Sequence, residues 1–95
     1  MPVHNADIAA IFDEIADLLE IEGANRFRVR AYRNAARTLR DLDRDIAAMI
    51  AEGEDVTALP GIGEDLASKI KEIVRTGTAS VLEEHRKNVP PLLRG

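Results

Sequence analysis

The segment PGIG at residues 60–63 constrains the fold of this chain more than any other feature. Apolar residues flank it at helical spacing, namely Val56, Leu59, Leu66, Ala67 and Ile70. This spacing predicts two short helices, over residues 55–59 and 64–76, that pack against each other across a tight turn. The glycines of the turn permit positive φ angles and a close approach by another molecule. We therefore predict a helix-hairpin-helix motif over residues 55–76.

The turn has the properties of an anion-binding site. The amides of Gly61, Gly63 and the following residues open the second helix, so unpaired N–H groups and the positive end of the helix dipole converge there. Such a point binds a phosphate without reading base sequence. We predict that Gly61, Ile62 and Gly63 contact a DNA backbone phosphate. A protein-binding hairpin of the same shape is the alternative that the residues leave open.

Apolar periodicity predicts helices in the rest of the chain as well. The first runs from a cap at Asn5 or Asp7 to a stop at Gly23, and a short third helix covers residues 45–51. The second starts between Arg26 and Val29, with Asn25 as a candidate cap. We expect the later start, because a helix that begins at Arg26 turns Arg28 toward the core.

The core-facing row of the second helix is expected at Ala31, Ala35, Leu39 and Leu42. Gly77 is expected to end the last long helix, and Ser80 to cap a final turn that contains Val81 and Leu82. The predicted fold is all-α, a compact bundle of four to five short helices with one helix-hairpin-helix motif.

Length and composition narrow the class of protein. With 95 residues the chain forms one domain, expected over residues 1–88, and residues 89–95 carry a Pro-Pro pair typical of a tail or linker. There is no cysteine, and the two histidines lie far apart, which argues against a side-chain metal site. No stretch is long and apolar enough for a membrane span, so we expect a cytoplasmic, nucleoid-associated protein.

Charge is strongly polarised along the chain. The net charge is -4, yet residues 26–40 hold six arginines and no acidic residue. Helical spacing places Arg30, Arg33, Arg37 and Arg40 on one face, where they repel one another without an acidic residue within residues 26–40 to relieve them. An anionic partner removes that cost, and we predict that Arg30, Arg33 and Arg37 bind DNA. A solvated charged face, or a face for an acidic protein, is the alternative.

Two segments carry a family resemblance. FRVRAYRNAA at residues 27–36 and LPGIGEDLASKIKEIVRTG at residues 59–77 resemble the N-terminal domain of family X, beta-like DNA polymerases, especially the bacterial ones. The resemblance implies a monomeric domain that binds gapped or nicked DNA independently of sequence and contacts the 5'-phosphate side of the gap. It also implies 5'-deoxyribose phosphate lyase activity, in which a lysine forms a Schiff base.

By position, Lys69 resembles the Schiff-base lysine and Tyr32 the tyrosine of the lyase pocket. Arg28 stands where the family has a phosphate-binding lysine, and Arg33 resembles a further backbone contact. The resemblance also implies a sodium or potassium ion between the motif and DNA, held by the backbone carbonyls of residues matching Thr57, Leu59 and Ile62. No other cofactor is expected.

Two positions depart from the family pattern. Phe27 stands where vertebrate members have a histidine, and Asp65 where they have a second phosphate-binding lysine. Asp65 precedes Lys69 by four residues, so an ion pair between them favours the ammonium form over the amine that a Schiff base needs. We therefore predict weak or absent lyase activity. The alternatives are a surface lysine paired with Asp65, and a half-buried packing role for Tyr32.

We do not expect this chain alone to catalyse DNA polymerisation. This reaction requires carboxylates that hold two metal ions in a separate nucleotide-binding lobe, for which there is no room here. We expect either the N-terminal domain of a DNA-directed DNA polymerase or a separate protein built on the same module. The rival function is that of a protein-interaction or non-specific DNA-binding module without enzymatic activity.

Overall fold

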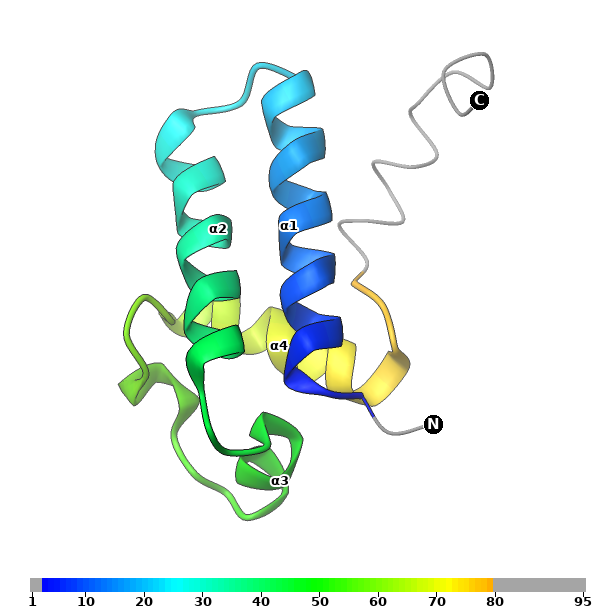
Figure 1. Cartoon of the computed structure of the whole chain (residues 1–95), viewed down its shortest axis with the longest axis vertical. Coiled ribbons are helices and arrows are strands. Elements are labelled where there is room, and N and C mark those ends of the chain that lie inside the picture. Colours follow the sequence, from blue (N-terminus) through cyan, green and yellow to red (C-terminus); the bar gives the residue numbers. More distant parts are fainter. Residues whose placement is uncertain (1–2, 80–95) are drawn as a thin grey trace.

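The computed structural model describes residues 3–79, which form helices without any strand. The elements are α1 (Asn5–Ile21), α2 (Arg26–Asp41), α3 (Ile46–Ala51), a single 3₁₀ turn η1 (Val56–Ala58) and α4 (Glu64–Thr76). Helices α1 and α2 form an antiparallel pair, and α4 lies across one half of that pair above α3 (Figure 1). The predicted all-α fold is confirmed. The expected turn at Ser80, Val81 and Leu82 and the tail at residues 89–95 lie outside the described residues.

The core lies where α1, α2 and α4 meet. Helix α1 contributes Ile8, Ala9, Phe12, Ile15, Ala16 and Leu19, all at most 2% exposed. Phe12 meets Tyr32 of α2 edge to face, with ring centroids 5.3 Å apart, a geometry that aromatic quadrupoles favour. The small residues Ala16, Ala35 and Ala36 are fully buried or nearly so and allow the two helix backbones to approach closely. The hairpin packs against this helix pair.

The start of α1 differs from the prediction of a cap at Asn5 or Asp7. His4 is the N-cap residue, and its backbone amide donates to Asp7 Oδ2 at 2.9 Å. Asn5 instead links two elements: its side-chain amide donates to the carbonyl of Arg44 at 2.6 Å, and its Oδ1 accepts from the amide of Ile46 at 2.9 Å. His4 caps α1 in place of Asn5, because the Asn5 side chain is hydrogen-bonded to the backbone at the start of α3.

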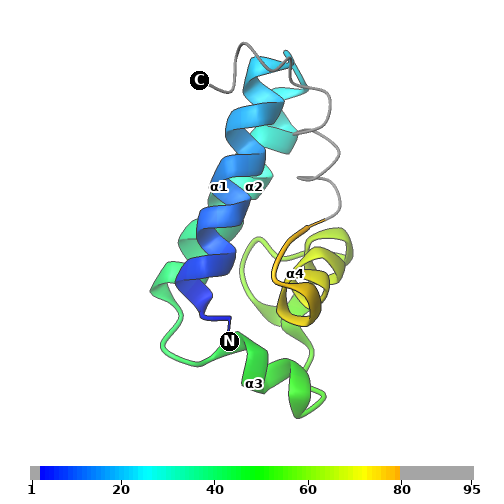
Figure 2. The same cartoon turned by 90° about the vertical axis from the view of Figure 1, so that its right-hand side faces the viewer.

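Helix α2 begins at Arg26, so the expectation of a later start is wrong. Asn25 is the cap, as predicted, and its Oδ1 accepts from the amide of Phe27 at 2.7 Å. Arg28 is nonetheless exposed, because the first turn of α2 extends beyond α4 (Figure 2). The buried face is centred on Tyr32 and Ala36 and also includes Val29, whereas Ala31 and Leu42 of the expected row are only partly buried.

The segment after α2 leads to the hairpin. Asp45 caps α3 by accepting from the amide of Ala47 at 3.1 Å. The first hairpin helix, predicted over residues 55–59, is a single 3₁₀ turn, with Asp55 as its cap. Pro60 limits its extension, because a residue before proline is driven out of the helical region, and Leu59 is indeed extended. Helix α4 has the predicted bounds and ends at Gly77 in the left-handed conformation.

Candidate nucleic-acid interface

The hairpin turn is shaped by its two glycines in different ways. Gly61 has φ of +76°, a conformation that L side chains rarely adopt. Gly63 has φ of -85° and ψ of -178°, which is extended backbone open to any residue. Of the two glycines, which both permit positive φ, only Gly61 adopts it. A Cβ atom at Gly63 meets nothing within 4 Å, so this position leaves space for another molecule.

Helix α2 holds the turn in place. Thr38 Oγ1 donates to the carbonyl oxygen of Pro60 at 2.8 Å. The Cβ of Asn34 lies 3.9 Å from the position that a Cβ at Gly61 would take. Between the glycines, the side chain of Ile62 is only 3% exposed and anchors the turn in the core. The turn therefore has a fixed orientation relative to α2.

The N-terminus of α4 presents unpaired amides. The first helical hydrogen bond runs from the amide of Ala67 to the carbonyl of Gly63 at 2.8 Å. The amides of residues 63–66 have no hydrogen-bond acceptor within the described part of the chain, and Gly63 offers no capping side chain. Glu64 and Asp65 place two carboxylates in this first turn, which lowers the local positive potential. The arrangement can bind one phosphate oxygen weakly.

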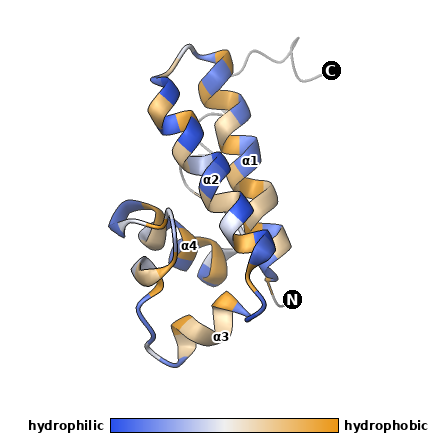
Figure 3. Cartoon of the chain, turned by 60° about the vertical axis from the view of Figure 1, so that its left-hand side comes forward, coloured by the Kyte–Doolittle hydropathy of each residue, from blue (hydrophilic) through white to orange (hydrophobic). Residues whose placement is uncertain are grey.

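An arginine groove borders the turn. Its volume is about 400 Å³, and its lining includes Arg26, Arg30, Arg33, Arg37, Asn34 and Glu20. Because Asn34 also lies next to the space at Gly61, the groove and the turn are neighbours. Figure 3 shows how hydrophilic residues dominate the outward side of α2 here. The structure thus places the groove with Arg30, Arg33 and Arg37 next to the turn residues 61–63, and their binding of DNA stays a prediction.

Two arginines of this face are already paired. Arg33 lies 2.8 Å from Asp17, 3.5 Å from Glu20 and 3.8 Å from Asp13, and Arg40 lies 2.7 Å from Asp13. Acids on the neighbouring α1 therefore relieve the repulsion at these two residues, which spacing within α2 does not reveal. The hydrogen bond with Asp17 is the main cause that raises the pKa of Arg33. A DNA-binding role for Arg33 remains a prediction.

Tyr32, Lys69 and Arg28 form a second cluster, on the α4 side of α2. Tyr32 is 2% exposed, and its hydroxyl is buried without a hydrogen-bond partner among residues 3–79. Burial raises the pKa of Tyr32, while the nearby charges of Lys69 and Arg28 partly lower it. The alternative of a half-buried Tyr32 therefore underestimates how deeply its side chain is buried. Lys69 and Arg28, which the family resemblance selects together with Tyr32, each lie within electrostatic reach of Tyr32.

Lys69 is held in its charged form. Its Nζ lies 3.0 Å from Asp65 Oδ1, the ion pair that the sequence predicts. Partial burial by itself lowers the pKa of Lys69, but the hydrogen bond with Asp65 and the neighbouring Tyr32 together raise it above the ordinary value. The side chain is 21% exposed, so solvent can reach it. At neutral pH the group is an ammonium ion and not a nucleophile.

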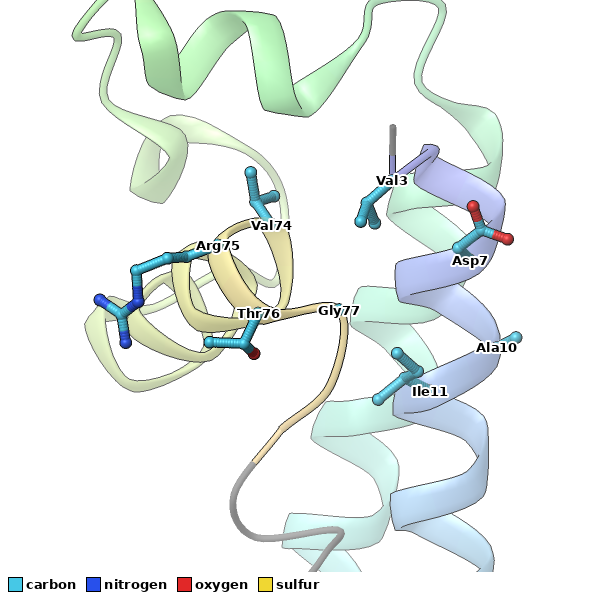
Figure 4. A pocket seen from close by; sticks show the side chains of 8 residues that line it. All are labelled: Val3, Asp7, Ala10, Ile11, Val74, Arg75, Thr76 and Gly77. Atoms are coloured by element: carbon cyan, nitrogen blue, oxygen red, sulfur yellow. The ribbon is translucent and has the colours of Figure 1, made fainter. Parts of the chain in front are cut away.

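Other features of the described chain do not add to this interface. A cavity of about 660 Å³ lies between the start of α1 and the end of α4, where Ile11 projects toward Thr76 and Gly77 (Figure 4). Within residues 3–79 no cluster of three or more His, Cys, Asp or Glu side chains is arranged to bind a metal ion. Across the same range, none of the helices combines the length and apolar character needed to cross a membrane.

Comparison with known proteins agrees with this geometry. A family model described as a helix-hairpin-helix domain matches residues 3–79. The chain belongs to this family. It is also 38% identical over 96 residues to a protein of Bacillus subtilis (strain 168) named DNA polymerase/3'-5' exonuclease PolX. That match covers 97% of this chain but 16% of the relative, in its N-terminal part. The resemblance to the N-terminal domain of family X polymerases is confirmed.

Sequence reasoning missed several residues of this helix-hairpin-helix domain. Asn34 and Thr38, which position the turn, lie on α2 at i and i+4 spacing, and these two uncharged polar residues among the arginines are a signal in the sequence. The acids Asp13, Asp17 and Glu20 repeat at helical spacing, which matches the spacing of Arg33 and Arg40 on an antiparallel neighbour. Both signals become specific only once the helices are placed side by side.

Proposed function

We propose that this chain is the DNA-binding domain of a family X-type DNA polymerase and that it holds backbone phosphates of gapped or nicked DNA without base preference. The observation that carries the proposal is the N-terminus of α4, where unpaired amides face the open space at Gly63. Membership of the helix-hairpin-helix family and the similarity to the N-terminal part of PolX support it. The activity of a whole polymerase is not expected of this domain alone.

Electrostatics favour a strand that enters beside the groove. Arg26, Arg30 and Arg37 have no acidic partner in the described part of the chain, so their charge is available to phosphates. Arginine forms two parallel hydrogen bonds with a phosphate, which fixes orientation as well as affinity. None of these contacts reads a base edge, so binding should be independent of sequence. We expect the domain to act as a monomer at the nucleoid.

The second cluster supports a contact with the 5'-phosphate side of a gap. Arg28 is exposed and lies within electrostatic reach of Tyr32, so its charge is available to a phosphate on this side of α2. A lyase step requires Lys69 Nζ as a neutral amine that attacks C1' of the opened deoxyribose, with loss of water to give the Schiff base. The Asp65 pair opposes this, and we propose that such activity is weak.

A monovalent cation at the carbonyls of Thr57, Leu59 and Ile62 is a further part of the proposal. The carbonyl of Leu59 already accepts from the amide of Ile62 at 3.1 Å, but a carbonyl oxygen has a second lone pair. The carbonyl of Ile62 accepts no backbone amide within residues 3–79. These oxygens fit an alkali cation, which there would add positive charge for a phosphate.

Fluorescence anisotropy with 5'-phosphorylated gapped DNA tests the function. Neutralising three phosphates predicts a fall in affinity of about 40-fold between roughly 50 and 200 mM salt. Gapped DNA of scrambled sequence should bind equally well. Affinity that does not change with salt contradicts phosphate binding, and binding of an acidic protein ligand in place of DNA supports the interaction-module alternative.

A further inference from the structure

We propose that the carboxylates of Asp13, Asp17 and Glu20 on α1 form an acidic rim that decides which DNA geometry the arginine groove accepts. The rim admits a single strand that leaves the hairpin turn and repels the second strand of a duplex. This inference rests on the proposed function, because it takes the hairpin turn as the point where the strand is held.

The basic side of the groove continues directly from the turn. Asn34 lines the groove, and its Cβ lies 3.9 Å from the position that a Cβ at Gly61 would take, so the groove and the turn are close to each other. From Arg37 to Arg26 the groove follows α2 for about 16 Å, at about 1.5 Å per residue. Neither of these arginines, nor Arg30 between them, has an acidic partner within residues 3–79. A strand that leaves the turn meets these three guanidinium groups.

On the α1 side, Glu20 lines the groove, and Asp17 and Asp13 follow it along α1 outside the groove lining. Three carboxylates surround only two guanidinium groups, those of Arg33 and Arg40, so a negative charge is left over. The side chains of Asp17 and Glu20 are 64% and 63% exposed, and Glu20 lines the groove itself. Their field therefore reaches a molecule bound beside α2.

A duplex in the groove places phosphates on both sides. Packed helices lie about 8–10 Å apart, which is comparable to the width of about 6–12 Å that separates the two strands across a DNA groove. The Debye length at physiological salt is about 8 Å, so screening does not remove repulsion at this range. One strand on the arginines then brings the other against Asp17 and Glu20. Like charges placed together exclude the wrong partner.

The test compares two probes with the same number of phosphates, a blunt duplex and a duplex with a single-stranded extension. The rim variant is Asp17→Asn with Glu20→Gln. Its matched control, Asp43→Asn with Glu52→Gln, removes two exposed carboxylates near α3. Exposed ion pairs contribute little to folding, so both variants should retain the wild-type circular dichroism spectrum.

We expect the wild type to prefer the extended probe. The rim variant should gain about tenfold affinity for the blunt duplex and much less for the extended probe, as expected from loss of one close repulsion. The control should change both affinities equally. Adding Arg33→Gln to the rim variant should leave the gain intact, which excludes release of Arg33 as its cause. Arg30→Ala with Arg37→Ala should weaken binding of the extended probe and lower the slope of its log affinity against log salt by about 1.4.

Several results overturn the inference. The first is equal affinity of the wild type for both probes, and the second is a rim variant that behaves like the control. The third is a gain in affinity for the blunt duplex that disappears when Arg33→Gln is added. A wild-type chain that binds neither probe contradicts the proposed function itself, so the two failures are distinguishable.

Discussion

Thr38 on α2 donates its hydroxyl to the carbonyl oxygen of Pro60, 2.8 Å away, and this bond joins the arginine-bearing helix to the hairpin turn. The two residues are 22 positions apart in sequence, so the bond fixes a tertiary relationship and not a local one. Because Pro60 precedes both glycines of the turn, the position of the proposed phosphate site depends on α2.

Replacing Thr38 by Val tests this connection. Valine keeps the shape of the side chain but cannot donate, so we expect a loss of about 1 kcal/mol of unfolding free energy. Helix content should be unchanged, while affinity for gapped DNA falls because the turn is less well oriented. Urea denaturation and anisotropy measure the two effects. Unaltered stability together with unaltered affinity contradicts the positioning role.

Substitutions at the two glycines should affect different properties, stability at Gly61 and DNA binding at Gly63. Gly61→Ala forces alanine into a left-handed conformation and should cost about 1–2 kcal/mol of stability. Gly63→Val leaves the chain unstrained and the helices formed, but its side chain occupies the space before the amides of α4, so DNA binding should be lost. A folded Gly63→Val protein with wild-type affinity shows that no phosphate binds there.

Gly63→Ser offers a sharper test of the same site. A serine at an N-cap accepts a hydrogen bond from an amide one turn into the helix, which stabilises a helix by a few tenths of a kcal/mol relative to glycine. The same hydroxyl competes with a phosphate for that amide. We therefore expect higher thermal stability and lower DNA affinity in one variant. An increase in both quantities contradicts competition for the amides.

Asp65 should control any reaction of Lys69. Asp65→Lys removes the partner that raises the pKa of Lys69 and adds a neighbouring cation that lowers it. More neutral amine is then present near pH 7–8, and borohydride trapping on DNA with a 5'-deoxyribose phosphate should increase. Wild-type trapping equal to that of Asp65→Lys contradicts this role of Asp65. In the Asp65→Lys background, trapping that survives Lys69→Ala moves the chemistry to another amine such as Lys71.

The buried hydroxyl of Tyr32 should make stability depend on alkaline pH. Its pKa and that of Lys69 are raised on folding, so the stability linked to both groups is complete below their unfolded pKa values, near about pH 10, and is lost as pH rises through the folded values. Tyr32→Phe should remove the tyrosine part of this loss and, at neutral pH, stabilise the fold by about 1 kcal/mol. Denaturant midpoints between about pH 8 and 11 check both statements. A destabilised Tyr32→Phe variant shows that the hydroxyl has a partner.

Local signals predicted most of the fold. The cap at Asn25 and the bounds of α4 follow from residues within one turn of the helix ends. The start of α2 was predicted too late because the exposure of Arg28 depends on where α4 ends. The first hairpin helix was predicted too long, because one turn before a proline is too short for apolar periodicity to define its length.

The candidate site could be predicted only in part for the same reason. Register within the family resemblance selected Arg28, Tyr32 and Lys69, which the structure places together. No pattern within α2 reveals that Arg40 pairs with Asp13, 27 residues away. Pairing across helices depends on their packing angle and rotation, which sequence spacing alone does not specify.

The bridge from Asn5 to Arg44 and Ile46 has a consequence for how the chain folds. It closes a loop of about forty residues, so the first turn of α1 acquires its native contacts only after α3 has left the ribosome. Contacts of such sequence separation form late in folding and slow it relative to a local helical pair. The beginning of the chain is therefore expected to be the last part of α1 to gain protection from hydrogen exchange during synthesis.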